Sequence, residues 1–202
     1  PVIYANAILV SPELPARSLK ELVAYVKANP GKVNSGTSGN GSTPHLSAVL
    51  LESMAGIQMT HVPYKGGSQT NIGLQNGEVQ VAFSPIVELL PLIKAGKVRA
   101  LAVTSSGRST LLPDLPAIVG QYPRYEIQIW NGIVPPAETP APVVTKLNQA
   151  VRRVLEGAEL KGKLLDLGLT AAGMPPDEFG AYIRSEITAF GRLTKLAGVR
   201  AE

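Results

Sequence analysis

The feature that most constrains the fold is the alternation of short apolar runs with longer amphipathic runs along the 202 residues. Runs at 7–10, 57–62, 79–83 and 98–104 have the β-branched or alternating pattern of strands. The run at 98–104 is almost entirely apolar, as expected for a strand with both faces covered. The alternation predicts an α/β fold with a largely parallel sheet. The other segments are expected to be helical at 19–29, 42–55, 68–75, 86–95, 140–154, 159–167 and 177–196, and extended at 125–134 and 169–172.

Local signals predict how several helices begin. Ser18 and Glu21 have capping-box spacing, in which a hydroxyl and a carboxylate each accept a hydrogen bond from a free backbone N–H. Ser42 or Thr43 is expected to cap the second helix, and Ser68 the third. In the last helix, the side chains predicted to face inward are Phe179, Ile183, Ile187, Phe190 and Leu193.

The composition argues against several classes of site. The chain has no Cys, which removes disulfides, thiolate nucleophiles and Cys-ligated metals, and its two His are too few for a His-rich metal centre. We therefore predict neither a metal nor a cofactor. The net charge is +4, but the basic residues are scattered and aromatic residues are only 5%. Nucleic-acid binding is therefore not expected, whereas a small anionic ligand suits this charge.

The most informative segment is 34–45, Asn-Ser-Gly-Thr-Ser-Gly-Asn-Gly-Ser-Thr-Pro-His, between a predicted strand and a predicted helix. A helix N-terminus offers unpaired N–H groups and a partial positive charge, and glycines let a ligand approach the backbone. The spacing G-x-x-G-x-G differs from the dinucleotide pattern, and the Lys-Ser/Thr of a P-loop is absent. The segment therefore predicts a cradle for an anion or carboxylate, or else a flexible connection before a well-capped helix. The candidate ligand-binding residues are Thr37, Ser38, Gly39, Asn40, Gly41, Ser42 and Thr43.

His45 and two other strand ends add candidates. His45 falls in the first helical turn, where it is either a ligand donor or the partner of a local hydrogen bond. Tyr64 and Lys65 follow the next strand and could give an anion a hydroxyl and a charge; otherwise Tyr64 packs on its loop and Lys65 is solvent-exposed. Phe83 and Ser84 end a third strand. Because ligands of open α/β sheets bind outside the carboxyl ends of strands, all three ends are expected to face one cleft.

Several motifs carry a resemblance to a known family. They are Ser38-Gly39-Asn40-Gly41 with His45-Leu46, then His61-Val62-Pro63-Tyr64-Lys65-Gly66, residues 93–104, Leu112-Pro113-Asp114-Leu115-Pro116, residues 135–140 and residues 175–179. Together they make the chain similar to the Bug family, the extracytoplasmic solute receptors of tripartite tricarboxylate transporters. The resemblance covers essentially all 202 residues.

The resemblance implies a fold like that of type II periplasmic binding proteins, in which two lobes close on a ligand. Residues 1–124 would form the complete second lobe, including the first hinge crossing. Residues 125–202 would form the return hinge strand and the C-terminal part of the first lobe. The N-terminal segment of the first lobe, with the family's Gly-Gly ligand loop, has no counterpart here. The first lobe is then expected to expose apolar surface, through which the chain could associate with a second copy.

The resemblance also implies a function without covalent chemistry. The protein would be periplasmic, would bind a small carboxylate (a di- or tricarboxylate, an acidic amino acid or an aromatic acid) and would deliver it to membrane permease subunits. Many relatives have an acid at the position of Ser84, and its absence could favour a more anionic ligand. Trp130 on the return strand either reaches the floor of the cleft or packs in the hinge.

Two other functions remain open on the sequence alone. The chain could be the cytoplasmic, ligand-sensing effector domain of a transcription regulator, since such domains share the two-lobe fold. It could also be a doubly wound enzyme with Lys65 or His61 as a base, although acid–base catalysis needs a positioned pair of groups.

Overall fold

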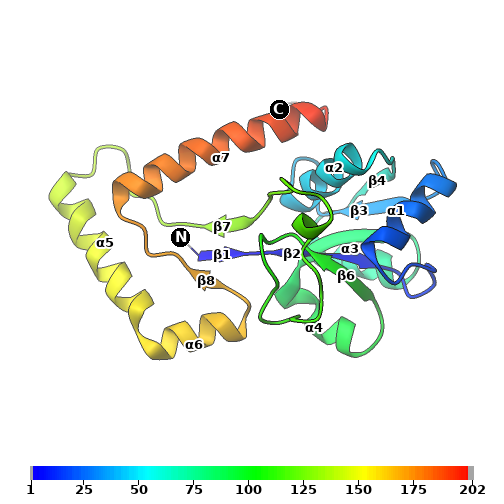
Figure 1. The fold of residues 1–202 in the computed structure, drawn as a ribbon. Helices are drawn as coiled ribbons and strands as arrows, with labels where there is room; N and C mark the ends of the chain where they lie inside the picture. Colours follow the sequence, from blue (N-terminus) through cyan, green and yellow to red (C-terminus); the bar gives the residue numbers. More distant parts are fainter. Residues whose placement is uncertain (1, 200–202) are drawn as a thin grey trace.

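Two β-sheets organise the structure, a computed structural model that describes residues 2–199 (Figure 1). The chain enters the small sheet as β1 (Val2–Tyr4) and, after Ala5, continues directly into the large sheet as β2 (Asn6–Val10). The first strand of one sheet is therefore covalently continuous with a strand of the other.

The large sheet has the strand order β4-β3-β5-β2-β6. Here β3 (Asn34–Thr37) lies parallel to β4 (Thr60–Pro63) and to β5 (Val81–Pro85). In contrast, β2 runs antiparallel to both β5 and β6 (Arg99–Val103). Four of the five strands thus point in the same direction, as predicted, but the reversed strand β2 makes two of the four pairings antiparallel.

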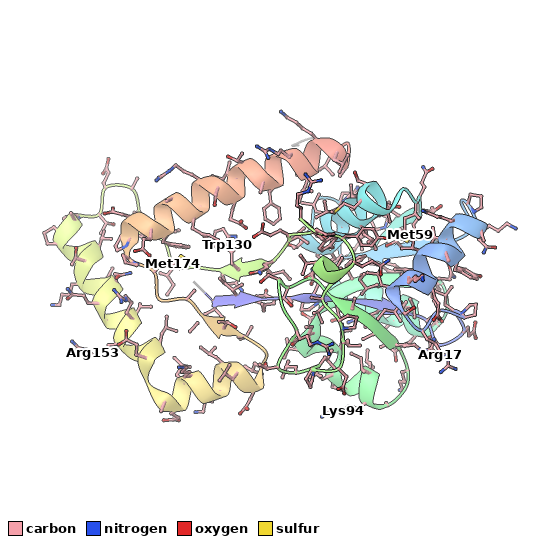
Figure 2. All side chains as sticks on the ribbon, viewed as in Figure 1. Arg17, Met59, Lys94, Trp130, Arg153 and Met174 are labelled. Atoms are coloured by element: carbon pink, nitrogen blue, oxygen red, sulfur yellow. The ribbon has the colours of Figure 1, made fainter. Side chains whose placement is uncertain are left out.

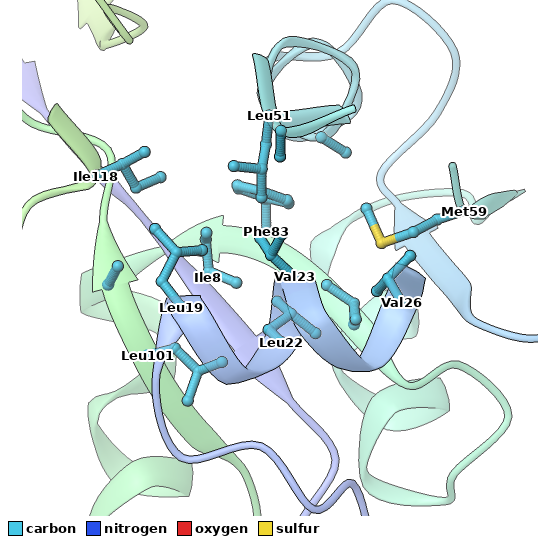
Figure 3. Close-up of a cluster of buried hydrophobic side chains, with 14 of the residues drawn as sticks. Ile8, Leu19, Leu22, Val23, Val26, Leu51, Met59, Phe83, Leu101 and Ile118 are labelled. Carbon is cyan, nitrogen blue, oxygen red and sulfur yellow. The ribbon is translucent and has the colours of Figure 1, made fainter. Parts of the chain in front are cut away.

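Helices cover both faces of this sheet, as the almost entirely apolar run at 98–104 predicted. On one face, α1 (Leu19–Ala28) and α2 (Thr43–Ala55) enclose a core with Phe83, Ile8 and Leu51 (Figure 3). On the other face, α3 (Gly67–Gln75) and α4 (Ile86–Lys94) pack on β2, β5 and β6. A single 3-10 turn, η1 (Ile118–Gly120), follows β6.

The helix starts match the sequence signals with two differences. The Ser18 hydroxyl accepts from the N–H of Glu21 at 3.2 Å, as predicted. The Glu21 carboxylate, however, accepts from the N–H of Arg17, one residue before the cap, at 2.8 Å. At α3 the capping residue is Gly66 rather than Ser68, because Gly66 adopts φ 131° and the helix begins at Gly67.

The small sheet has the order β7-β1-β8, so its central strand comes from the start of the chain and its two outer strands from the C-terminal part. Both β7 (Ile129–Asn131) and β8 (Thr170–Ala171) pair antiparallel with β1. The strand expected over 125–134 is therefore only three residues long. The reason is that Tyr125 and Ile127 are buried in the core of the large part instead of pairing in a sheet.

Three helices accompany the small sheet: α5 (Ala141–Glu156), α6 (Ala158–Asp166) and α7 (Pro176–Leu196). Figure 1 shows α7 running from the small sheet across to α2. Near the end of α7, Phe190 and Leu193 pack, as predicted, against the hydrophobic core that α1 and α2 form on the large sheet. The prediction for Ile187 is wrong, since its side chain is 67% exposed. None of the described helices is long and apolar enough to cross a membrane.

An apolar surface lies on the C-terminal part. None of the described side chains of α5, α6 or α7 is fully buried, and the stripe of α5 at Val143, Leu147, Val151 and Val154 is exposed. A cavity of about 720 Å³ opens between α5, α7 and the segment after β7. Such a surface was expected of the first lobe. The division into lobes at residue 125 stays a prediction, and Pro1 and residues 200–202, at the ends of these lobes, lie outside the described residues.

Substitution of Leu51 tests whether the core between α2 and the large sheet is as tightly packed as described. Its side chain is fully buried between α2 and the sheet, so Leu51→Ala should lower the free energy of unfolding by about 2–5 kcal/mol through lost burial and a residual cavity. Ile72→Ala is the control, because Ile72 is 55% exposed on α3, and it should change the free energy by less than about 0.5 kcal/mol. Urea unfolding followed by circular dichroism measures both, and equal effects would contradict this account of the core.

Candidate functional site

One edge of the large sheet collects the strand ends that the sequence singled out. Because β3, β4 and β5 are parallel, all three end at this edge, and α2, α3 and α4 begin directly beyond it. The edge thus brings together the loop 37–43, the turn 64–67 and the end of β5 at residues 84–85. Three helix N-termini, each with free N–H groups, lie along it.

Two polar residues that the sequence analysis missed belong to the same edge. Because β2 is antiparallel to its neighbours, it begins where β5 and β6 end. There the N–H of Asn6 donates to Thr104 Oγ1 at 3.0 Å, and the N–H of Thr104 donates to the carbonyl of Asn6 at 2.9 Å. No sequence motif marks this pair, because the antiparallel insertion of β2 alone brings residues 6 and 104 together.

The glycine loop is fixed by hydrogen bonds within itself. Gly39 and Gly41 have φ angles of 115° and 75°, which side chains rarely allow. Ser42 caps α2: its hydroxyl donates to the carbonyl of Gly39 at 2.7 Å and accepts from the N–H of His45 at 3.4 Å. The N–H of Gly41 donates to His45 Nδ1 at 3.0 Å. The alternative of a flexible connection therefore does not describe this loop.

These contacts narrow the set of donors that a ligand could use. The N–H of Gly41 is engaged, and Gly41 also lies against Val199, just beyond the end of α7. Within the described chain, the N–H groups of Gly39, Asn40 and Thr43 have no hydrogen-bond partner. Asn40 is exposed, whereas Ser38, Gly39 and Thr43 are half-buried. The loop therefore presents a small group of unpaired donors beside the positive end of α2.

Thr37 and Ser84 lie beneath this edge rather than on it. Their side chains are 0% and 1% exposed, and neither hydroxyl has a partner among the described residues. The side-chain oxygen Oδ1 of Asn6 is also buried and also has no hydrogen-bond partner among the described residues. Buried polar atoms are nearly always paired with protein or with ordered water. Because both hydroxyls are buried, any contact between them and a ligand at this edge would have to be indirect.

The N-terminus of α3 already has an anion of its own. The residue Gly66 before it gives no side-chain cap. A carboxylate oxygen of Glu88, in the first turn of α4, lies 2.9 Å from the position that a Cβ on Gly67 would take. A carboxylate there is favoured by the helix dipole. The sequence analysis missed Glu88, since only tertiary packing brings its carboxylate to the start of α3, where it disfavours a second anion.

Tyr64 and Lys65 differ in what they can contribute. The Tyr64 hydroxyl donates to a Glu78 carboxylate oxygen at 3.1 Å, and its ring lies against Gly36 and Gly73. Burial and the neighbouring Glu78 raise the pKa of Tyr64. Lys65 is exposed, and its ammonium has no ion-pair partner within residues 2–199. Of the two, only Lys65 has an uncommitted polar group.

Phe83 and Trp130 point away from the loop. Phe83 is 1% exposed and lies in the core beneath α2 (Figure 3). Trp130 lies beneath α7 (Figure 2), where its ring makes edge-on contacts with Phe179 and Tyr182 and its Nε1 donates to Glu186 at 2.9 Å. The structure thus gives Trp130 the packing role that the sequence left as one alternative.

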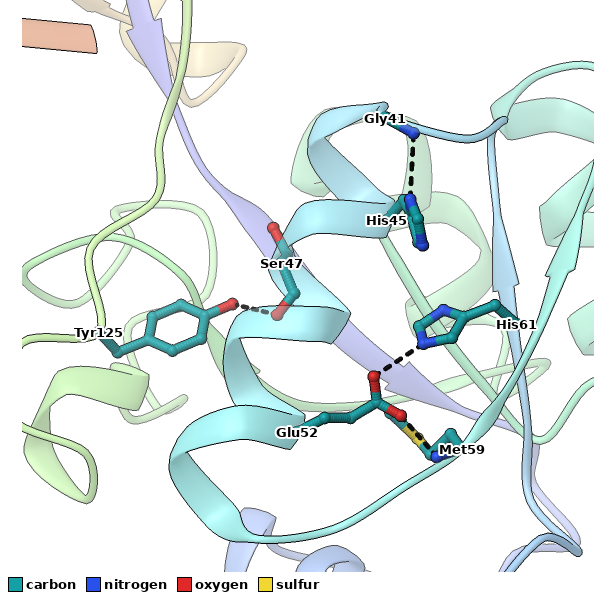
Figure 4. A network of polar contacts seen from close by, with 7 residues as sticks. All are labelled: Gly41, His45, Ser47, Glu52, Met59, His61 and Tyr125. Atoms are coloured by element: carbon teal, nitrogen blue, oxygen red, sulfur yellow. Dashed lines mark hydrogen bonds and ion pairs between the residues drawn. The ribbon is translucent and has the colours of Figure 1, made fainter. Parts of the chain in front are cut away.

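Behind the loop lies a cluster of two imidazoles and a carboxylate (Figure 4). His61 Nε2 lies 2.7 Å from Glu52 Oε2, and Glu52 Oε1 accepts from the N–H of Met59. The His45 and His61 rings meet edge-on with centroids 4.9 Å apart. Burial, and then the neighbouring His61, lower the pKa of His45, whereas Glu52 acts in the opposite direction. The cluster joins the loop to α2 and β4.

Comparison with known proteins places these features in a family. The sequence model of the protein family described as "Tripartite tricarboxylate transporter family receptor" matches residues 2–199 of this chain. A UPF0065 protein in the tcbD–tcbE intergenic region of Pseudomonas sp. is 30% identical, aligned over 96% of this chain and 59% of its own length. Protein BugT of Bordetella pertussis is 28% identical, over 96% of this chain and 60% of its own length. The chain thus spans about three fifths of these curated relatives.

Solved structures agree with the fold. Rpa4515 of R. palustris with adipate superposes with a TM-score of 0.89 at 33% identity, covering 98% of this chain and 67% of that protein. MatC of Rhodopseudomonas palustris with bound malate gives a TM-score of 0.79 at 27% identity, covering 95% and 67%. The predicted α/β architecture is therefore confirmed at the level of the fold.

Substitution of Gly41 tests the backbone conformation of the loop 37–43. Gly41→Ala forces a side chain into a left-handed conformation, which should cost about 1–2 kcal/mol of unfolding free energy. The matched control is Gly162→Ala in α6, which has ordinary φ and open space, and which should stabilise by about 0.5–1 kcal/mol. Urea unfolding of both variants measures the difference, and a stabilising Gly41→Ala would show that the loop has another shape.

Proposed function

The chain belongs to the tripartite tricarboxylate transporter receptor family, and on that basis we propose that it is a solute-binding protein that captures a small organic acid. The ligand carries at least one ionised carboxylate, with di- and tricarboxylates, acidic amino acids and aromatic acids as the candidate classes. Because the chain spans about three fifths of its curated relatives, the activity proposed is that of the whole receptor.

The observation that carries this proposal is the set of unpaired N–H donors at the start of α2. Gly39, Asn40 and Thr43 present N–H groups that have no partner in the described chain. They lie at a helix end that favours negative charge. At the corresponding end of α3, a carboxylate oxygen of Glu88 lies 2.9 Å from the position that a Cβ on Gly67 would take, which disfavours a second anion there. A carboxylate of the ligand, with two oxygens, would supply the acceptors that the α2 end lacks.

We assign each candidate residue a proposed role in binding the ligand or in supporting the site. Gly39, Asn40 and Thr43 bind the carboxylate through backbone N–H groups, with the Ser38 and Thr43 hydroxyls beside them. Lys65 adds positive charge without a fixed contact. Ser42, Gly41 and His45 shape the loop, since their polar atoms bond to one another. Thr37 and Ser84 act through a bridging water. Tyr64, Phe83 and Trp130 support these elements by packing.

Two relatives support the ligand class. The structures of Rpa4515 and MatC are described with adipate and malate, and both are dicarboxylates. Ser84 is uncharged, whereas Glu88 puts one carboxylate near the same edge. A dianionic ligand would therefore place its first carboxylate at α2 and its second away from Glu88.

We further propose that the receptor works in the periplasm and delivers its ligand to permease subunits, as the family's description as a transporter receptor suggests. Capture and delivery need no covalent step, so we propose that the protein is not an enzyme. The family match also argues against an effector domain of a transcription regulator. His61, one of the two candidate bases of the enzyme alternative, is paired with Glu52 on the side of α2 behind the loop.

A thermal-shift panel on the protein as its gene encodes it tests the proposal. The panel contains adipate, malate, citrate, glutamate, benzoate and the neutral diamide of adipic acid as the matched control. At a concentration of 100 times Kd, an acid that binds should stabilise the fold by about 2.7 kcal/mol. For a domain of this size, that corresponds to an increase in Tm of roughly 5–10 °C.

Stabilisation by at least one acid, with none from the diamide, supports the carboxylate site. If the diamide stabilises the protein as strongly as adipate, the carboxylate is not what the site recognises. If no acid shifts Tm but purified protein consumes one of them, the enzyme alternative replaces the proposal.

A further inference from the structure

The hydrogen bond between Gly41 and His45 fixes the protonation state of an imidazole. The N–H of Gly41 points at His45 Nδ1 at 3.0 Å, so Nδ1 must offer a lone pair. His45 is therefore neutral in this loop geometry, with its ring proton on Nε2. A protonated His45 would have N–H groups on both ring nitrogens, and one of them would face the N–H of Gly41.

A second set of contacts holds the imidazole in place. His45 is 6% exposed and lies one helical turn after Gly41. The His61 ring contacts it edge-on at 4.9 Å, and His61 is in turn fixed by Glu52 at 2.7 Å (Figure 4). Glu52 is anchored to the N–H of Met59. The ring of His45 therefore cannot easily turn away when its charge changes.

We propose that His45 is a positioning residue for the ligand, which holds the glycine loop in its binding shape only while the imidazole is neutral. This inference rests on the proposed function, because it concerns the same loop. Gly41 has a φ of 75° and is followed by the cap of α2, so releasing its N–H changes the path of the backbone between Gly39 and Thr43. The N–H groups proposed to bind the carboxylate lie within that stretch.

The consequence is a loss of affinity in acid. The titratable groups that act on the imidazole are His61 on β4 and Glu52 on α2 itself. Burial and His61 favour the neutral ring, and Glu52 favours the charged one, with a net lowering of the pKa of His45 from its usual 6.5. A lowered pKa keeps the loop intact at neutral pH. Affinity for the ligand should therefore fall as the pH approaches and passes the lowered pKa of His45, where the free protein takes up a proton on the imidazole.

The test compares wild type with His45→Asn and His45→Ala. The Asn side-chain oxygen can accept from the N–H of Gly41 and does not titrate, whereas Ala has no acceptor. The ligand is the acid from the panel above that gives the largest shift in Tm. Its dissociation constant is measured by calorimetry at pH 7.5 and at lower pH values that span the protonation of His45. Titration of the ligand's own carboxylates affects all three proteins equally, so only differences between them matter.

At pH 7.5, His45→Ala should weaken binding, and His45→Asn should recover part of the loss. Over the pH range in which the ¹⁵N shifts show His45 taking up its proton, wild type should lose more affinity than His45→Asn. Equal pH dependence in wild type and His45→Asn would overturn the proposal. A purely structural role for His45 would change Tm in both variants without this difference in the pH profile.

Measurements on the ligand-free protein test the role of His45 separately from the proposed function. In wild type, the ¹⁵N shifts of His45 should show the Nε2–H tautomer at pH 7.5, and the Gly41 amide should lose hydrogen-exchange protection as His45 is protonated. A His45 with its proton on Nδ1, or a Gly41 amide whose protection ignores His45 protonation, would refute the positioning role even if acids bind. If no acid binds at pH 7.5, the proposed function fails, while this loop measurement still decides the role of His45.

Discussion

The pairing of β2 within the large sheet is the constraint on which the rest of the structure depends. All five of its residues are buried, and it pairs with β5 on one side and β6 on the other. Its side chains alternate between the two cores, with Ile8 in one and Leu9 in the other. Because β1 continues into β2 after a single residue, the same strand also fixes where the small sheet begins. Burial of β2 thus stabilises the hydrophobic cores on both faces of the large sheet. It also fixes the position at which the chain passes from the small sheet to the large one.

The candidate site follows from strand direction and helix ends. Parallel β3, β4 and β5 deliver three helix N-termini to one edge, and each end needs a partner for its free N–H groups. The ends are satisfied differently: α3 has the carboxylate of Glu88 beside it, whereas α2 has a Ser42 cap and a loop with unpaired donors. Our proposal that an external anion binds at α2 rests on this difference in local electrostatics as well as on the glycine pattern.

Particular residues show how far the sequence predicted this arrangement. Ser18, Ser42 and the helix over 42–55 were correct because capping and helical periodicity are local. Ile187 was wrong because the helical spacing of α7 cannot tell which neighbour covers each turn, and only Phe190 and Leu193 reach the large core. Asn6, Thr104 and Glu88 were missed because each reaches the edge through strand insertion or helix packing. Which residues of the edge bind a ligand remains a prediction.

The sequence by itself determined the α/β class, most of its helices and strands, the family and the loop that begins α2. These follow from periodicity, capping residues and motifs, all of which act over a few neighbouring positions. Only the tertiary structure decided that Gly41 gives its N–H to His45, that Thr37 and Ser84 are buried without partners, and that Trp130 packs beneath α7. The physical reason is that a hydrogen bond or a desolvated hydroxyl depends on which groups meet across space, and in this fold residues far apart in the chain meet at one sheet edge.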